Sequence, residues 1–432
     1  MSKDPRVRPL LLGAIADDVT GATDLGSTLS RNGMDVVQVL GPPAADDEPV
    51  EADAIVVALK TRTAPVDQAV SQSVDAARWL LERGARQLFF KYCSTFDSTE
   101  SGNIGPVAEA LLDLVEEDFT VACPAYPENE RTVYQGHLFV GDRLLSESGM
   151  GHHPLTPMAD ADLVRFLGKQ CRRPDSVGLV PFDAVDLGAS AIRVSIGELR
   201  GQGVRLAVVD ATKEDHLWST ATAVAELRLV TGGSGIARGL PANYRRIDAL
   251  PQRIEPEPPR LVPPVAVLAG SCSEATRAQV AAMAARHPTF ALDPIALATG
   301  RQTVEAVAAE ARSALEGEAV LIHSTAAPEE IEKAQKTLGR EQASETLEKA
   351  FGDIAAALVD SGVRTLVIAG GETAGRVAAA LGLRRLRIGT EIDPGVPWTL
   401  HLGEPVLHLA FKSGNFGSED FFLKALKALE RS

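Results

Sequence analysis

The strongest constraint on this chain is a repeated alternation of short apolar runs with amphipathic stretches. Leu10–Ala16 is an apolar run typical of a buried parallel strand, Asp17 to Gly21 reads as a turn, and Ala22–Asn32 has helical spacing ended by Gly33. Repetition of such units predicts βαβ connections, which build a mostly parallel sheet with helices on both faces. We therefore expect an α/β fold.

The same pattern continues along the chain and is interrupted by a predicted insertion. Gly136 to His153 has Gly-Asp turns between short apolar runs and predicts a β-hairpin. Further strands are predicted at Met34–Leu40, Ala54–Leu59, Gln87–Lys91, Thr120–Ala122, Ser176–Val180, Val204–Val209, Leu227–Thr231, Val265–Ala269, Phe290–Leu292, Glu318–His323, Val363–Ile368 and Val406–Ala410.

A proline-rich stretch divides the chain. The 432 residues are enough for two or three domains, and Pro251–Pro264 holds six prolines in fourteen residues without strand or helix periodicity. We expect an N-terminal domain over residues 1–250, a linker over 251–264 and a C-terminal domain over 265–432, each with its own mostly parallel sheet flanked by helices. The alternative is a surface loop within one large domain.

The charge balance restricts the partners. With 43 Lys and Arg against 58 Asp and Glu, the net charge is −15, which disfavours nucleic acid and anionic membranes as partners. The four cysteines contain no CxxC pair, so neither a zinc site nor a disulfide framework is predicted. Because no apolar run approaches 18 residues and no signal peptide is recognisable, we expect a cytoplasmic protein.

Polar residues follow the predicted strands of the first half. Asp17 and Asp18, with Thr20 and Gly21, end the first strand, where a carboxylate could accept a hydroxyl proton or bind a polyol. A helix N-cap is the alternative for these residues. Arg62 follows the third strand, and such a cation suits a small polyhydroxylated carboxylate, although strand-end cations are often solvated.

The next strand ends in Lys91, Tyr92, Cys93, Ser94 and Thr95, which add a cation and hydroxyls to the same edge of the sheet. The stretch 98–105 (STESGNIG) then leads into a helix and could offer N–H groups to an anion.

Glycine-rich turns follow three strands of the second half, as AGSCSEAT (269–276), AGGETAG (369–375) and KSGNFG (412–417). Glycines permit close backbone approach, and helix N-termini favour phosphate oxygens, so three such turns in one domain predict a nucleotide site. One domain for a polar acid and another for a nucleotide predict phosphoryl transfer, with the active site in the interdomain cleft. The charged stretch 325–348 reads as a solvated face or a helix that contacts a partner.

Taken together, these motifs resemble the four-carbon acid sugar kinases, which join an N-terminal sugar-acid-binding domain to a C-terminal nucleotide-binding domain. The resemblance runs from about Leu10 to about Leu426. It rests on the three glycine turns and on IADDVTGATD (15–24), KYCSTFDSTESGNIGPV (91–107), PAYPENERTVYQGHLFV (124–140), EIDPGVPW (391–398) and KSGNFGSEDFF (412–422). CSTFDST at 93–99 and the C-terminal motifs are similar to the 3-oxo-tetronate 4-kinase branch. Val19 departs from the Phe common in the family.

The resemblance implies ATP-dependent phosphorylation of the C4 hydroxyl of 3-oxo-tetronate (3-dehydro-tetronate), a step of four-carbon acid sugar catabolism. It implies that Asp17 or Asp18 accepts the hydroxyl proton, that Arg62 holds the substrate carboxylate and that Lys91 stabilises developing charge. Substrate contacts are expected at Asp17, Arg62, Lys91, Ser94 and Thr95. ATP contacts are expected at Ser271, Ser273, Gly370, Gly371, Glu372, Thr373 and Gly414. Mg²⁺ is expected with ATP on chemical grounds, with no ligands assigned.

Three other functions compete with this interpretation. A dinucleotide-dependent oxidoreductase would need a GxGxxG turn after a strand, and the chain has none. A non-catalytic sugar-acid sensor would use the C-terminal glycine turns only structurally. A D-threonate or D-erythronate 4-kinase would share the chemistry and differ at C3 of the substrate. The expected partners are a small-molecule sugar acid and ATP, and the expected assembly is a homodimer.

Overall fold

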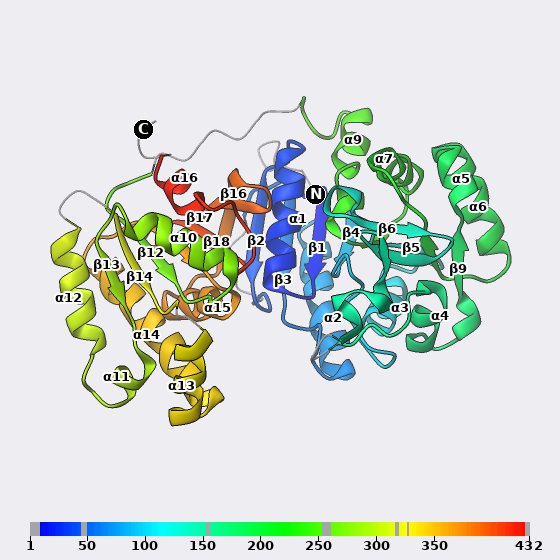
Figure 1. Ribbon diagram of the computed structural model, residues 1–432. Coiled ribbons are helices and arrows are strands. Elements are labelled where there is room, and N and C mark those ends of the chain that lie inside the picture. The colour runs from blue at the N-terminus through cyan, green and yellow to red at the C-terminus, as the bar shows by residue number, and fades with distance from the viewer. Residues whose placement is uncertain are drawn as a thin grey trace. The chain divides into compact units, whose positions relative to one another are not determined.

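The computed structural model describes residues 9–44, 50–152, 156–252, 261–315, 319–325 and 328–427 (Figure 1). The chain divides into two compact units, residues 1–255 and 256–432. The centre of the proline-rich stretch, residues 253–260, lies outside the described residues. Within the part of the chain that is described, no helix has both the length and the apolar character that crossing a bilayer requires.

Unit 1 is built on a parallel sheet with the strand order β2-β3-β1-β4-β11-β5-β10-β9. Its strands are β1 (Leu12–Ala16), β2 (Val36–Leu40), β3 (Ala54–Ala58), β4 (Gln87–Lys91), β5 (Thr120–Cys123), β9 (Val177–Val180), β10 (Leu206–Val209) and β11 (Leu229–Gly232). Its helices are α1 (Val19–Arg31), α2 (Val66–Glu82), α3 (Ile104–Leu114), α4 (Leu163–Gln170), α5 (Phe182–Asp186), α6 (Ala189–Gly201), α7 (Glu214–Ala223), α8 (Ser234–Ala237) and α9 (Leu240–Arg246).

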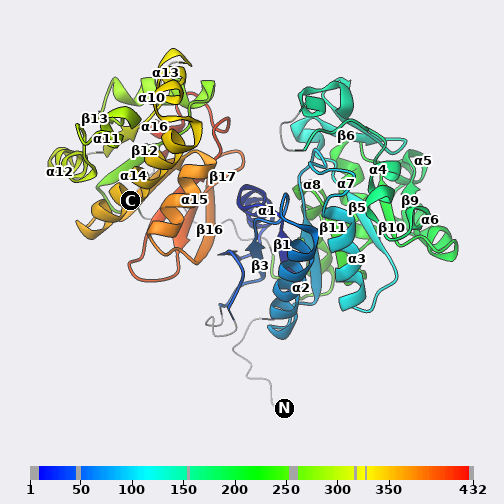
Figure 2. The same cartoon turned by 90° about the horizontal axis from the view of Figure 1, so that it is seen from below.

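Helices cover both faces of this sheet, as predicted. One group of helices is a row in which α3 contacts both α2 and α4. The other is a row in which α1 contacts α8, α8 contacts α7 and α7 contacts α6 (Figure 2). The chain leaves β1 through α1 toward β2, whereas it leaves β4 through α3 toward β5. The strand order therefore reverses between β1 and β4, and ligands of open α/β sheets bind at the carboxyl ends of strands at such a point.

The predicted hairpin is a three-stranded antiparallel sheet of β6 (Arg131–Tyr134), β7 (His137–Val140) and β8 (Arg143–Leu144). It begins five residues before the predicted start, and residue 153 lies outside the described residues.

Unit 2 carries a mixed sheet with the strand order β13-β14-β12-β15-β18-β17-β16. Its strands are β12 (Val265–Ala269), β13 (Thr289–Ala291), β14 (Ala319–His323), β15 (Thr365–Ala369), β16 (Arg385–Asp393), β17 (Val396–His401) and β18 (His408–Lys412). Its helices are α10 (Glu274–Ala284), α11 (Pro294–Ala298), α12 (Val304–Ala314), α13 (Pro328–Leu338), α14 (Arg340–Asp360), α15 (Gly371–Ala380) and α16 (Phe421–Lys427).

Five parallel strands of unit 2 follow the prediction, but the antiparallel strands β16 and β17 were not predicted. Their sequence was interpreted only as a family motif, EIDPGVPW. α14 contacts both α12 and α15, and α10 contacts α16. The chain leaves β12 through α10 to β13 on one side of the sheet, and it leaves β15 through α15 to β16 on the other side. The strand order of this sheet therefore reverses between β12 and β15.

Candidate active site

The first candidate site surrounds Arg62 in unit 1. Arg62 Nε and Nη2 donate to Asp17 Oδ2 and Oδ1, both over 2.9 Å, which is the bidentate geometry of a strong ion pair. Nη2 also donates to Asp18 Oδ1 over 2.6 Å, and Nη1 lies 3.4 Å from Asp97 Oδ2. Three carboxylates therefore share one guanidinium at the carboxyl ends of β1 and β3.

Asp18 has a second role, because it is the N-cap of α1. Its backbone is extended, with φ −148°, and Oδ1 accepts the N–H of Gly21 over 3.0 Å. The cap starts the helix at Val19, so the predicted turn over 17–21 was too long by three residues. The capping interpretation is thus confirmed for Asp18, whereas the functional interpretation of this pair of acids stays a prediction.

Burial and charge act in opposite directions on the central ion pair. Burial raises the pKa of Asp17, and the guanidinium of Arg62 only partly offsets this effect. Burial lowers the pKa of Arg62, but the negative charges of Asp17 and Asp18 outweigh it and raise that pKa, so Arg62 stays charged. A buried carboxylate with a raised pKa, oriented by a fixed cation, is suited to accepting a proton.

Lys91 joins this group from the neighbouring strand. It pairs in register with Ala16, its carbonyl accepts the N–H of Asp17 over 3.1 Å, and its buried Nζ donates to Tyr92 O over 2.9 Å. A Cβ on Gly21 would lie 3.1 Å from Lys91 Nζ, so glycine at this position leaves the ammonium its space. The sheet thus brings Asp17, Arg62 and Lys91 together where its strand order reverses.

The two predicted hydroxyl residues lie in the loop after β4. Thr95 is buried and its Oγ1 lies 3.0 Å from Cys93 Sγ, whereas Ser94 is half-buried. Phe96 follows with φ 54°, which is uncommon for a bulky residue, and its buried ring packs edge-on between Tyr92 and Phe166. This packing holds the strained turn that separates Thr95 from Asp97.

Sequence reasoning missed three residues of this site. Asp97 contacts Arg62 and also accepts a hydrogen bond from Thr156 Oγ1. Asn103 Nδ2 donates to the carbonyls of Thr61, Arg62 and Ala64, over 2.7, 3.3 and 2.9 Å. Asn103 lies in the stretch 98–105, where an anion site of backbone N–H groups was expected rather than a side chain that fixes the Arg62 loop. Asp97 lies in the motif CSTFDST, to which no contact with Arg62 was assigned.

The second candidate site is a cavity of about 300 Å³ in unit 2. It lies where the strand order reverses, because Ala269 of β12 pairs in register with Ala369 of β15 and both strands end there. The cavity is lined by Gly270, Ser271, Ser324, Ser344, Leu347, Glu348, Phe351, Gly370, Gly371, Glu372, Thr373 and Gly414. Six of the seven residues predicted to contact ATP are among them.

Ser273, the seventh, does not line the cavity. Its Oγ accepts the N–H of Thr276 as the N-cap of α10 and donates to the carbonyl of Gly414 over 2.5 Å. Ser273 therefore joins the first glycine turn to the third, while the neighbouring Ser271 faces the cavity.

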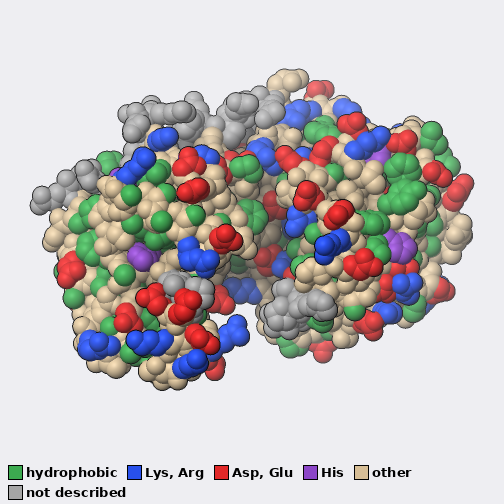
Figure 3. Space-filling view, viewed as in Figure 1, with side chains coloured by type: hydrophobic (Ala, Val, Ile, Leu, Met, Phe, Trp, Pro, Cys, Tyr) green, Lys and Arg blue, Asp and Glu red, His purple; other side chains and the backbone are tan. Residues whose placement is uncertain are grey.

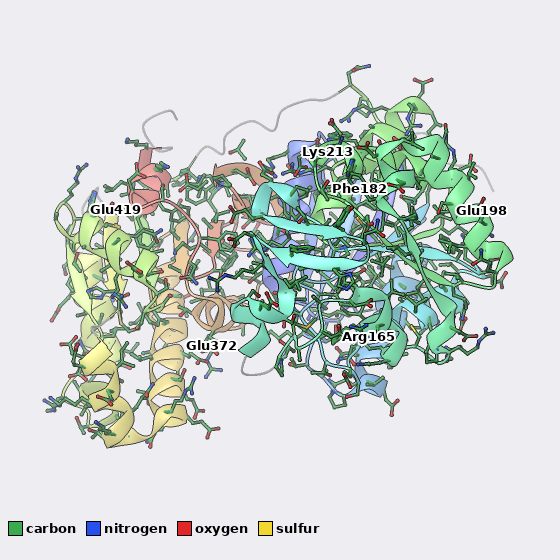
Figure 4. All side chains as sticks on the ribbon, turned by 45° about the vertical axis from the view of Figure 1, so that its right-hand side comes forward. Arg165, Phe182, Glu198, Lys213, Glu372 and Glu419 are labelled. Atoms are coloured by element: carbon green, nitrogen blue, oxygen red, sulfur yellow. The ribbon has the colours of Figure 1, made fainter. Side chains whose placement is uncertain are left out.

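The N-terminus of α15 opens on this cavity without a side-chain cap from any described residue. Its cap position is Gly370, at φ 123°, a conformation that requires glycine. The first N–H groups of a helix lack intrahelical partners and carry its positive dipole end, so Gly371, Glu372 and Thr373 can present donors to an anion. Figure 4 labels Glu372 at this end of α15.

Helix α14 and the end of β14 supply the lining residues that were not predicted. Ser324 follows β14, as the strand-end argument would have allowed, but Ser344 and Glu348 belong to the charged stretch interpreted as a solvated face or partner contact. For these two residues that interpretation was wrong, because α14 packs against α15 beside the cavity. Ser344 Oγ donates to Glu348 Oε1 over 2.9 Å.

Among the residues that the structure describes, His, Cys, Asp and Glu form no preformed cluster that could hold a metal ion. The cavity nevertheless presents two carboxylates, Glu348 and Glu372. Mg²⁺ is commonly held by one or two carboxylates together with the phosphates of a nucleotide, so these residues fit a metal that arrives with its nucleotide.

Comparison with known protein families assigns different ligands to the two units. A family model described as a sugar-binding N-terminal domain matches residues 12–240, and one described as a nucleotide-binding C-terminal domain matches residues 266–422. Over 98% of its length the chain is also 54% identical to a 3-oxo-tetronate kinase of Burkholderia multivorans, itself covered to 98%. The chain belongs to the four-carbon acid sugar kinase family, in its 3-oxo-tetronate kinase branch.

Another curated relative and two solved structures match over similar lengths. A 3-oxo-tetronate kinase of Cupriavidus necator is 54% identical, with 98% of both chains covered. The crystal structure of the Haemophilus influenzae protein HI1011 superposes with a TM-score of 0.86 at 43% identity, over 96% of this chain and 100% of that one. A structure from Salmonella typhimurium LT2 gives a TM-score of 0.88 at 41% identity, over 96% and 98%.

Proposed function

We propose that this protein phosphorylates the C4 hydroxyl of 3-oxo-tetronate with ATP. The observation that carries the proposal is the likeness to 3-oxo-tetronate kinases over 98% of the chain at 51–54% identity. The two sites support it, because a cluster of carboxylates and cations suits a polyhydroxylated acid and an uncapped helix N-terminus suits a nucleotide phosphate.

In unit 1, Asp17 is the proposed acceptor of the C4 hydroxyl proton. Arg62 donates a hydrogen bond to each carboxylate oxygen of Asp17, so the carboxylate is held in one orientation. Each of these oxygens keeps a lone pair for the substrate. Lys91, next to the same strand end, is proposed to stabilise the charge that develops on the transferred group. Binding of the substrate carboxylate by Arg62 stays a prediction. Four of the five N–H donors of its guanidinium already bind Asp17, Asp18 and Asp97, so a bidentate contact with the substrate would displace one of these carboxylates.

In unit 2, the phosphates of ATP are proposed to bind at the N-terminus of α15, against Gly371, Glu372 and Thr373. Glu348 and Glu372 would hold Mg²⁺ together with the phosphates. The positive charge of the ion would reduce the repulsion between the phosphates and the attacking C4 oxygen. Ser271 and Gly414 would contact the nucleotide from the opposite glycine turns.

The reaction forms a bond from the C4 oxygen to the γ-phosphorus while the bond from that phosphorus to the β–γ bridging oxygen breaks. The hydroxyl proton passes to Asp17, and ADP leaves. Positioning and electrostatics supply most of the rate, since this chemistry asks for no covalent intermediate. The cleft location of the active site, the boundaries of the domains, the homodimer and the cytoplasmic location stay predictions.

Figure 3 shows the distribution of charged side chains on one face of the molecule. On the face shown in Figure 3, Lys and Arg side chains are interspersed with Asp and Glu and do not gather into one basic surface.

The test is a coupled assay of ADP release with ATP and Mg²⁺, comparing 3-oxo-tetronate with D-threonate, D-erythronate and L-threonate. Turnover of the keto acid at a far higher kcat/KM than that of the reduced acids is the expected result. A preference for a reduced acid would retain the kinase and reject the proposed substrate. No turnover of any of the four acids would reject both.

A further inference from the structure

A buried lysine lies directly behind the nucleotide cavity of unit 2. Lys412 ends β18, pairs in register with Ala369 of β15, and is only 2% exposed. Its Nζ donates to the carbonyls of Gly414, Phe416 and Ser413 over 2.9, 3.1 and 3.3 Å and lies 3.0 Å from Thr276 Oγ1. Gly414, which its ammonium contacts, is part of the cavity wall.

Within the described residues, no carboxylate pairs with this ammonium: all its partners are carbonyl and hydroxyl oxygens. Burial alone lowers the pKa of Lys412, to about 8, so the side chain is still mostly charged near pH 7. An unpaired buried charge is costly, and most buried charges in proteins are paired for that reason.

Hydrogen bonding alone does not explain why a lysine stands here. The carbonyl of Gly414 also accepts from Ser273 Oγ and Thr276 Oγ1, and that of Phe416 also accepts from Gln279 Nε2. Neutral donors already satisfy the two closest carbonyls of the loop. What Lys412 adds to them is a positive charge.

We propose that Lys412 is a positioning residue whose buried positive charge attracts the phosphates of the nucleotide through the 412–417 loop. The negative charge of the bound phosphates would then be the counter-charge that the buried ammonium otherwise lacks. The inference rests on the proposed ATP site. In low-dielectric surroundings, a positive charge that is separated from the cavity by a single residue still attracts a polyanion in that cavity strongly. The contribution therefore grows with the number of phosphates and vanishes for an uncharged nucleoside.

The experiment measures dissociation constants of ATP, ADP, AMP and adenosine by calorimetry on the full-length chain. The variants are Lys412→Met, which removes the charge and the donors, and Lys412→Gln, which removes the charge and keeps a donor. Lys333→Met, at an exposed position of α13, is the matched control for loss of one positive charge. Thermal unfolding of each variant reports whether the fold is intact.

For both Lys412 variants we expect ATP affinity to fall about 10- to 50-fold, as expected for loss of a nearby charge. The affinity for ADP should fall less than that for ATP, and the affinity for AMP should fall less than that for ADP. The affinity for adenosine should change by less than about twofold. An equal loss for all four ligands would show a purely structural role and overturn the inference. So would unchanged ATP binding in either Lys412 variant. If the wild-type chain itself does not bind ATP, the proposed function fails first and this inference fails with it.

Discussion

Asp17→Asn is the most informative substitution in this protein, because it removes a negative charge from the proposed proton acceptor at nearly constant volume. The amide cannot accept the C4 proton, and loss of a general base typically costs about 100- to 10,000-fold in rate. We expect kcat to fall within that range while the KM for ATP changes little, since the proposed ATP contacts all belong to unit 2.

The stability cost of this substitution follows from the same contacts. The Asn oxygen can keep one of the two 2.9 Å bonds from Arg62, so one charge-assisted hydrogen bond is lost. Such a bond contributes about 1.5–3 kcal/mol, and Arg62 retains Asp18 as a partner, so we expect a loss of about 1–3 kcal/mol. At about 2–4 °C per kcal/mol for a domain of this size, Tm should fall by several degrees and the chain should stay folded at 25 °C.

Asp18→Asn is the matched control. Asn caps helices as well as Asp does, so α1 should keep its start, and only one of the contacts of Arg62 changes. The assay is steady-state kinetics with ADP release, alongside thermal unfolding of both variants. Near-wild-type kcat for Asp17→Asn would refute the proton-acceptor role. A large loss confined to Asp18→Asn would transfer that role to Asp18, whose Oδ2 has no hydrogen-bond partner among the described residues.

Three further predictions follow from the two sites. Burial raises the pKa of Asp17, and only its deprotonated form accepts a proton. We therefore expect kcat/KM for the sugar acid to decline as the pH falls, with an apparent pKa above 3.8. An apparent pKa at or below 3.8 in the pH profile of kcat/KM would contradict this. Asn103→Ala should raise the KM for the sugar acid about 5- to 50-fold through loss of three hydrogen bonds that hold the Arg62 loop, with the KM for ATP unchanged; equal changes in both constants would argue against it. Gly270→Ala should lower Tm and ATP affinity, because its Cβ would clash with Thr373 Oγ1, whereas Gly371→Ala, whose Cβ meets nothing, should leave Tm unchanged in the same measurements.

The sequence by itself predicted most of the strands and the polar residues that follow them. Apolar runs such as Val265–Ala269 and Gln87–Lys91 were located to the residue, because a buried parallel strand needs a continuous apolar run whatever surrounds it. The antiparallel pair β16 and β17 was missed because polar residues interrupt both strands. β16 has the sequence RLRIGTEID and is mostly half-buried, whereas β17 is mostly buried but its sequence, VPWTLH, is broken by Pro397 and Thr399.

Only the tertiary structure decided which of the polar residues at those strand ends contact one another. Asp17 and Arg62 are 45 residues apart in the chain, and their bidentate pairing depends on β1 and β3 being neighbours in the sheet. Ser344 and Glu348 face the cavity because α14 packs beside α15, which no local pattern encodes. Local periodicity determines which elements form, whereas contacts between distant segments determine which side chains share a site.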